Sequence, residues 1–130
     1  MIRGICLSTV AFMMLAAPAF AQDAAPASTC MDPMVPTMPD GATAPAADIR
    51  AAATSVTTYV KEADDYQLCL NVEFNALVEQ NKKEKKVMSG AENRARIAKI
   101  NASQKAKEEL GKAYGATAAA YRKAHPPAPR

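Results

Sequence analysis

The sequence predicts an all-α protein: a long antiparallel two-helix hairpin with a proline-rich extended N-terminal arm that a disulfide clamps to the first helix. Three observations predict it. Apolar residues recur every three or four positions through two long segments, which is the spacing of one face of an α-helix. Gly90 separates the two segments and is typical of a chain reversal. Two cysteines, Cys30 and Cys69, remain once an export signal is removed.

Residues 1–21 have the pattern of a cleaved secretory signal peptide. A positive charge begins the segment, an apolar run follows, and Ala19 and Ala21 occupy the small-residue positions of a cleavage site. The run is shorter than the roughly 20 apolar residues that span a bilayer, so a retained anchor helix is the minor alternative. A lipid anchor is disfavoured, because no large aliphatic residue stands at the lipoprotein position before Cys30. We therefore expect a periplasmic or secreted product with no membrane span after signal cleavage.

In an exported chain, two cysteines most simply form one disulfide, here Cys30–Cys69. Two free or intermolecular thiols are the alternative. The bridge would close a loop of about 40 residues, which in the chain-entropy model stabilises the fold by about 3 to 4 kcal/mol.

The arm is expected to comprise residues 22–43. Pro33, Pro36 and Pro39 recur at every third position, which is the repeat of a polyproline II helix. The Pro-Asp-Gly sequence at its end is typical of a turn that reverses the chain. An internal, clamped role is favoured over that of a proline-rich ligand for another domain.

The length of the extended arm matches the length of the helix along which the disulfide would hold it. Residues 30–43 would extend roughly 40 Å at about 3.1 Å per residue. Residues 44–69 would span roughly 37 Å along a helix at about 1.5 Å per residue. The arm can therefore lie along the first helix, and the disulfide can hold its far end.

The first helix is expected at about residues 44–87. Thr43 is expected to cap it, and Pro45 is tolerated in a first turn. Lysines near its end suit the negative end of the helix dipole. The apolar stripe includes Ile49, Val56, Val60, Leu70, Phe74 and Leu77.

The second helix is expected at about residues 91–124, with Ser89 as its cap. Residues 125–130 contain His-Pro-Pro, which cannot continue a helix, and are expected to form a disordered tail. The apolar stripe includes Ile97, Ile100, Ala106, Leu110, Thr117 and Ala124.

A bend at Gly90 would place facing residues at numbers that sum to 180. This register pairs Leu70 with Leu110 and also matches tyrosines: Tyr59 with Tyr121, and Tyr66 with Tyr114.

The charges of the two predicted helices also favour their pairing with each other. Residues 22–80 hold two Lys or Arg against nine Asp or Glu, and residues 81–130 hold thirteen against four. Exposed pairs contribute only about 0 to 1 kcal/mol each, so the charge adds specificity more than stability.

The chain resembles a group of short exported helical proteins of alphaproteobacteria, which share a proline-rich start, two cysteines and two long helices. The resemblance covers most of the chain after the signal peptide and implies the compartment and the fold, but no activity. The residues that carry it are Cys30, Pro33, Pro36, Pro39-Asp40-Gly41, Thr43, Val56, Tyr59, Tyr66, Cys69-Leu70 and Ile100-Asn101-Ala102.

No catalytic constellation is present in the sequence, so a non-enzymatic protein without a cofactor is expected. The single histidine, His125, lies in the tail, where a general base would lack a fixed geometry. Asp64 and Asp65 point about 100° apart on a helix and are expected to face water. We expect a periplasmic interaction or structural protein of the cell envelope, with an unidentified protein or envelope partner. A homodimer that pairs two hairpins into a four-helix bundle is weighed equally against a monomer.

The first alternative is a copper- or metal-handling protein. Met31, Met34 and Met38 lie close in sequence, and thioethers suit Cu(I). Methionines beside helices more often fill gaps in packing, which is the favoured interpretation.

The second alternative is a binder of anionic envelope surfaces through a basic tip at the bend. Lipid or lipopolysaccharide are the expected ligands. Nucleic acid is not expected, because no aromatic residues interleave with the cations. The tip residues are Lys82, Lys83, Lys85, Lys86, Arg94 and Arg96.

Overall fold

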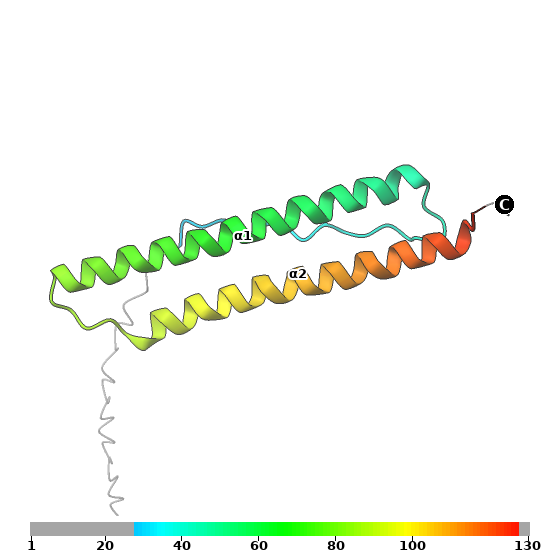
Figure 1. Ribbon diagram of the computed structural model, residues 1–130. Coiled ribbons are helices and arrows are strands. Elements are labelled where there is room, and N and C mark those ends of the chain that lie inside the picture. Colours follow the sequence, from blue (N-terminus) through cyan, green and yellow to red (C-terminus); the bar gives the residue numbers. More distant parts are fainter. Residues whose placement is uncertain (1–27, 128–130) are drawn as a thin grey trace, which may run out of the picture.

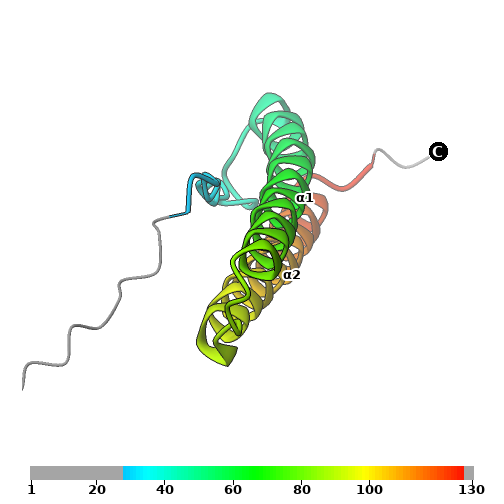
Figure 2. The same cartoon turned by 90° about the vertical axis from the view of Figure 1, so that its left-hand side faces the viewer.

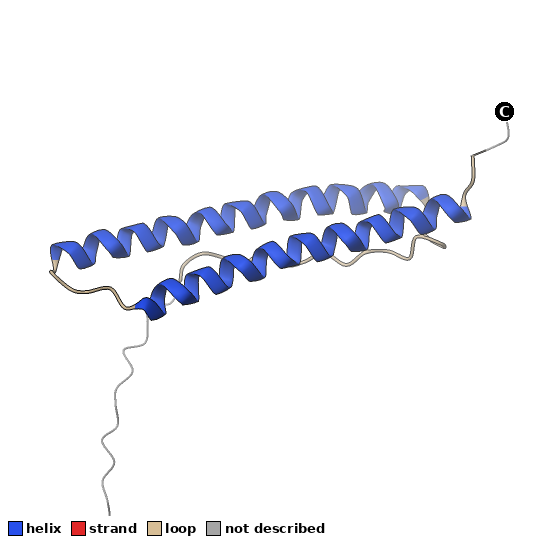
Figure 3. Ribbon diagram, turned by 60° about the horizontal axis from the view of Figure 1, so that its bottom comes forward, coloured by secondary structure: helices blue, strands red, loops and turns tan. Residues whose placement is uncertain are grey.

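The computed structural model describes residues 28–127. The predicted signal peptide, residues 1–21, lies outside the described residues. Two antiparallel helices, α1 (Ala46–Lys83) and α2 (Gly90–Ala124), lie side by side over nearly their whole length (Figure 1). Residues 28–127 contain no strand, and Figure 3 shows only helix and loop. The predicted all-α hairpin is confirmed.

The arm, residues 28–45 in the structure, runs beside the helices without helix or strand until a turn at residues 41–43. It lies to one side of the helix pair, as Figure 2 shows. A disulfide joins Cys30 to Cys69, with the two Cα atoms 5.8 Å apart. The predicted clamp between the arm and the first helix is therefore present.

Asp40 builds the turn that leads from the arm into α1. Its carboxylate accepts hydrogen bonds from the Ala42 amide (3.0 Å) and the Thr43 hydroxyl (3.1 Å), and its carbonyl accepts one from the Ala44 amide (2.8 Å). The prediction that Thr43 caps the helix is wrong, because its hydroxyl bonds to Asp40. The cap position is Pro45, which lacks a side-chain donor or acceptor.

A small core lies where the arm, α1 and α2 meet. Its most buried members are Tyr59, Ala63 and Leu110, and Met38 from the arm packs against them. Tyr66 is also buried, and burial raises the pKa of both tyrosines, with a smaller contribution from the Asp32 carboxylate. The arm thus supplies a third layer that covers apolar surface on the two helices.

The turn of the arm docks against the last turns of α2. The Thr117 hydroxyl donates a hydrogen bond to the Pro39 carbonyl (3.3 Å). A Cβ atom at Gly41 would lie 2.0 Å from the Thr117 carbonyl oxygen. Only glycine therefore permits this close approach of backbone to backbone.

We expect Gly41→Ala to lower the free energy of unfolding by about 1 to 3 kcal/mol, because the backbone of α2 cannot yield as a flexible side chain would. Urea unfolding followed by circular dichroism measures it. Gly111→Ala is the matched control. A Cβ at Gly111 meets nothing within 4 Å, so alanine there should stabilise the helix by about 0.5 to 1 kcal/mol. Equal effects of the two substitutions would contradict the close approach.

The register between the helices differs from the prediction. The Gln67 amide donates to the Ser103 hydroxyl (3.1 Å), and Lys107 pairs with Asp64 (2.6 Å). The numbers of these pairs sum to 170 and 171, so the predicted pairing at 180, including Tyr66 with Tyr114, is wrong. It is displaced by about ten residues, or roughly 15 Å along a helix. Gly90 begins α2 instead of lying at the centre of the bend, which spans residues 84–89.

The end of α1 explains the shift. The Lys86 amide donates to the Asn81 carbonyl (2.9 Å) and the Lys85 amide to the Lys82 carbonyl (3.2 Å). This pair of bonds is a Schellman motif, in which the residue after the C-cap takes a left-handed conformation. Lys85 does so with φ of 54°. The helix therefore ends at Lys83 instead of near residue 87, and a lysine occupies a position that glycine usually fills.

We expect Lys85→Gly to raise the free energy of unfolding by up to about 1 kcal/mol, because glycine adopts positive φ without a steric cost. Thermal unfolding measures the gain. Lys83→Gly, inside the last turn of α1, is the control and should destabilise by a similar amount. Destabilisation by both substitutions would contradict the left-handed cap.

Candidate functional site

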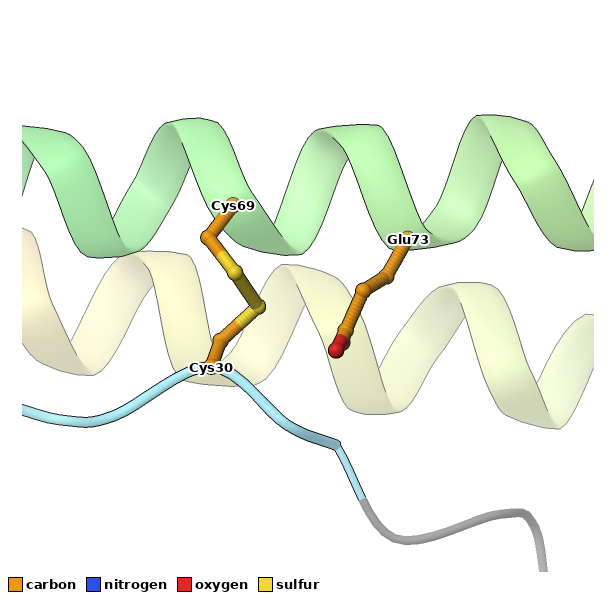
Figure 4. Close-up of side chains that lie close together, drawn as sticks. All are labelled: Cys30, Cys69 and Glu73. Atoms are coloured by element: carbon orange, nitrogen blue, oxygen red, sulfur yellow. A yellow bond between two sulfur atoms is a disulfide. The ribbon is translucent and has the colours of Figure 1, made fainter.

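The start of the described arm is held at one place on α1. Cys69 and Glu73, one helical turn apart, both reach toward the arm in Figure 4. The Glu73 carboxylate accepts hydrogen bonds from the Ser28 hydroxyl (2.6 Å), the Thr29 amide (2.8 Å) and the Thr29 hydroxyl (2.5 Å). A covalent bond and a carboxylate therefore attach residues 28–30 of the arm to α1.

These donors lower the pKa of Glu73 from its ordinary value of 4.5, with the Ser28 hydroxyl the largest cause and Thr29 next. A lowered pKa in the folded state means that the fold favours the ionised carboxylate. The resulting stabilisation is present above the ordinary pKa and is lost as the pH falls through the lower, folded value.

We expect Glu73→Gln to release residues 28–29, because a neutral amide accepts weaker hydrogen bonds than a carboxylate. Hydrogen exchange at the Thr29 amide should become several-fold faster at pH 6. The unsubstituted protein should lose the same protection, measured against the intrinsic exchange rate at each pH, only below about pH 4.5. Glu79→Gln is the control, because Glu79 bonds to Lys82 and not to the arm. Unchanged exchange in Glu73→Gln would contradict the anchoring role.

Sulfur and oxygen atoms of Cys30, Cys69 and Glu73 lie within 4.8 Å of one another. The two sulfurs are bonded to each other, so neither is the thiolate that a metal ion requires. In this oxidised form the cluster holds the arm and offers only one anionic ligand.

The structure contains an open cleft of about 380 Å³ between the later turns of α1 and the first turns of α2. Its floor is apolar, and Arg96 and Lys99 project into it from α2. Ser28, at the start of the described arm, also lines it. The residues around this open cleft are Ser28, Leu70, Glu73, Phe74, Ala76, Leu77, Gln80, Glu92, Ala95, Arg96 and Lys99.

The open cleft continues the groove in which the arm lies. Steps of three and four residues along α1 lead from the buried Tyr66 to Leu70 and Leu77 in the cleft. Similar steps along α2 lead from Leu110, beneath the arm, back to Lys99. Residues on one face of a helix recur at this spacing, so the same faces form both parts of the groove.

Arg96 is one of the residues that line the open cleft, and its contacts hold it between the helices. Its guanidinium lies 4.4 Å from the centroid of the Phe74 ring and donates to the side-chain oxygens of Asn71 and Asn93. Its Nε atom is buried and has no hydrogen-bond partner within residues 28–127. The charge is thus stabilised by neutral groups and an aromatic face.

The predicted basic tip is divided in the structure. Arg96 is half-buried between the helices, so its assignment to an exposed tip is wrong. The physical reason is the helix face on which it lies, which is turned toward Phe74 and Asn71. Lys82 pairs with Glu79 and Lys86 with Glu84. The remaining exposed members are Lys83, Lys85 and Arg94.

The methionine cluster is divided as well. Met38 packs on the core, while Met31 is 87% exposed and Met34 is 90% exposed. The expectation that all three fill gaps in packing is right for Met38 alone. Met31 and Met34 project into water from the outer side of the arm.

Other singled-out residues have local roles. Asp64 pairs with Lys107 across the helices and Asp65 with Lys61 along α1. The ring of His125 stacks on Tyr121, with centroids 4.3 Å apart. Leu68 and Val72 are exposed apolar residues on α1. The expected homodimer stays a prediction.

Comparison of the chain with protein-family models, with curated proteins and with solved structures finds no match. Within residues 28–127, neither α1 nor α2 has the apolar stretch that a bilayer-spanning helix requires. Sequence reasoning identified the disulfide but missed Glu73 and the open cleft. The apolar stripe through Phe74 and Leu77 was the available signal, since it continues beyond the reach of the arm.

Proposed function

We propose that this protein is a non-enzymatic interaction module of the cell envelope, exported to the periplasm, and that the open cleft binds its partner. The observation that carries the proposal is an apolar groove filled by the arm over one part and open over the next. An apolar cleft with a few placed polar groups is the usual form of a binding site. The disulfide suits an oxidising compartment.

The open cleft is favoured over the two alternatives by specific contacts. The separate environments of Met38 and the two exposed methionines favour no common copper site. Ion pairs at Lys82 and Lys86 reduce the charge that a basic tip offers to an anionic surface. The cleft, in contrast, combines apolar area with Arg96 and Lys99.

Site-directed photo-crosslinking in living cells tests the proposal. A photoreactive phenylalanine analogue at Ala76, which lines the open cleft, should crosslink a discrete envelope partner. The same analogue at Ala119, an exposed residue of α2 outside the cleft, should not. Ala95→Trp, which fills the cleft, should abolish the product from Ala76. Equal products from both positions, or none from Ala76, would refute the proposal.

Export is tested separately by the N-terminal sequence of the periplasmic form. Removal of residues 1–21 should leave Gln22 as the first residue. A cytoplasmic, unprocessed chain would exclude the periplasmic compartment.

A further inference from the structure

The arm shows what kind of molecule the groove between α1 and α2 accepts. It is an extended chain that places Met38 on the core cluster and bonds at both ends, Pro39 to Thr117 and Thr29 to Glu73. Side-chain contacts supply the apolar burial, and main-chain hydrogen bonds fix the path, as in other sites that hold extended peptides. The same helix faces continue into the open cleft, beyond Ser28.

The floor of the open cleft suits a second extended apolar segment. Leu70, Phe74 and Leu77 supply the α1 side, and Ala95 is the small residue opposite on α2. Because the small side chain of Ala95 faces large side chains on α1, the space between them can hold a peptide segment. Continuity with the arm's groove therefore favours a peptide over a compact ligand.

Charges around the open cleft favour an acidic group on that peptide. Neither Arg96 nor Lys99 forms an ion pair in the part of the chain that the structure describes. Both acids of the lining already bond to other groups: Glu73 to Ser28 and Thr29 at the arm end, and Glu92 to the Ser89 hydroxyl (3.2 Å) at the loop end. Within residues 28–127, Arg96 bonds only to the neutral side chains of Asn71 and Asn93, so the charges of Arg96 and Lys99 are not neutralised by an acid and can attract an incoming carboxylate.

We propose that the open cleft takes an extended apolar peptide segment of the partner carrying one acidic side chain, and that Lys99 and Arg96 bind its carboxylate. The proposal rests on the interaction function proposed above and specifies the chemistry of the partner. The peptide continues the line of the arm, with its apolar side chains on Phe74 and Leu77, which are partly exposed.

A peptide with the sequence of residues 30–39, with serine in place of Cys30, is the probe. It carries prolines, methionines and one acidic residue, Asp32, and it represents what the groove already accepts. Titration into the isotope-labelled oxidised chain from residue 22 should give saturable NMR shifts at Ala95, Arg96 and Lys99. Resonances of the bound arm, such as Met38, should not move, because the disulfide keeps the arm in place.

A double-mutant cycle isolates the carboxylate contact. Replacing the peptide's aspartate with asparagine should weaken binding about five-fold, and Lys99→Gln should weaken binding of the acidic peptide by a smaller factor, because Arg96 remains. Lys99→Gln should not affect the asparagine peptide. Lys112→Gln, an exposed cation of α2 outside the cleft, is the matched control and should change neither affinity. Because Lys99 is exposed, its substitution should not disturb folding, unlike that of Arg96.

Four results would overturn the proposal, and the first three are no saturable shifts at the open cleft, equal affinity for the two peptides, and displacement of both by palmitate. That displacement would assign the site to an acyl chain. Tighter peptide binding after deletion of residues 22–27 would instead identify this chain's own preceding segment as the occupant and would also overturn it. If the peptide test fails but the analogue at Ala76 still crosslinks a partner, the proposed interaction function stands. The partner would then have a different chemistry from the one proposed.

Discussion

Reduction of the Cys30–Cys69 disulfide is expected to lower the free energy of unfolding by about 4 kcal/mol. The bond closes a loop across a sequence separation of 39 residues. In the chain-entropy model, opening such a loop gives the unfolded chain this much additional freedom. The folded state also loses a fixed arm, and with it the cover that Met38 gives to the core. Urea unfolding of the oxidised and the reduced protein, followed by circular dichroism, measures the difference.

The double variant Cys30→Ser/Cys69→Ser separates the bond from the reductant. It should unfold at the same urea concentration as the reduced protein, and added reductant should not shift it. NMR signals of residues 28–34 should become those of a mobile chain in both. Identical unfolding of the oxidised and reduced proteins would contradict this contribution of the bond to stability.

Leu110→Ala is expected to destabilise the fold by about 2 to 5 kcal/mol, the range for removing a buried leucine. Leu110 is 3% exposed and contacts Tyr59 and Ala63 where α1, α2 and the arm meet. The core is small, so few neighbours are available to close the resulting cavity. Chemical unfolding measures the loss.

Leu68→Ala is the matched control, because it removes the same atoms from a side chain that is 63% exposed. We expect a change within about 0.5 kcal/mol. A large effect at Leu68 in the isolated protein would indicate that this face is covered, and its dependence on protein concentration would then test the expected homodimer.

Much of the architecture could be predicted from local patterns. Apolar residues at steps of three and four gave two helices, and the second was correct to within a residue at each end. The cysteine pair could be assigned because only Cys30 and Cys69 lie outside the predicted signal peptide. The Pro-Asp-Gly turn was recognisable because Asp40 and Gly41 have local preferences that do not depend on distant contacts.

The register could not be predicted in the same way. Two apolar stripes with the same period can be matched at several offsets along the helices. The register in which the residue numbers of the tyrosine pairs sum to 180 was therefore one of several possible registers. Interactions that mark the observed register are Gln67 with Ser103, Asp64 with Lys107, and Arg96 with Asn71. Each joins residues of ordinary surface type, and none is distinguishable from a solvated side chain in the sequence.

The candidate site shows the same division. In the sequence, Arg96 cannot be told apart from the other cations of a basic segment. Its position over Phe74 in the structure shows that it lies between the helices. Glu73 reads as a surface acid, and only the path of the arm brings Ser28 and Thr29 to it.

The sequence by itself determined the helical class, the two long helices and the single disulfide, because these depend on periodicity, capping and the count of cysteines. Tertiary structure decided where α1 ends, how the helices are offset and which part of their groove stays open. These features depend on contacts between residues far apart in the chain. A lysine with positive φ at position 85 and a cleft lined by Ser28 from the arm have no local signature.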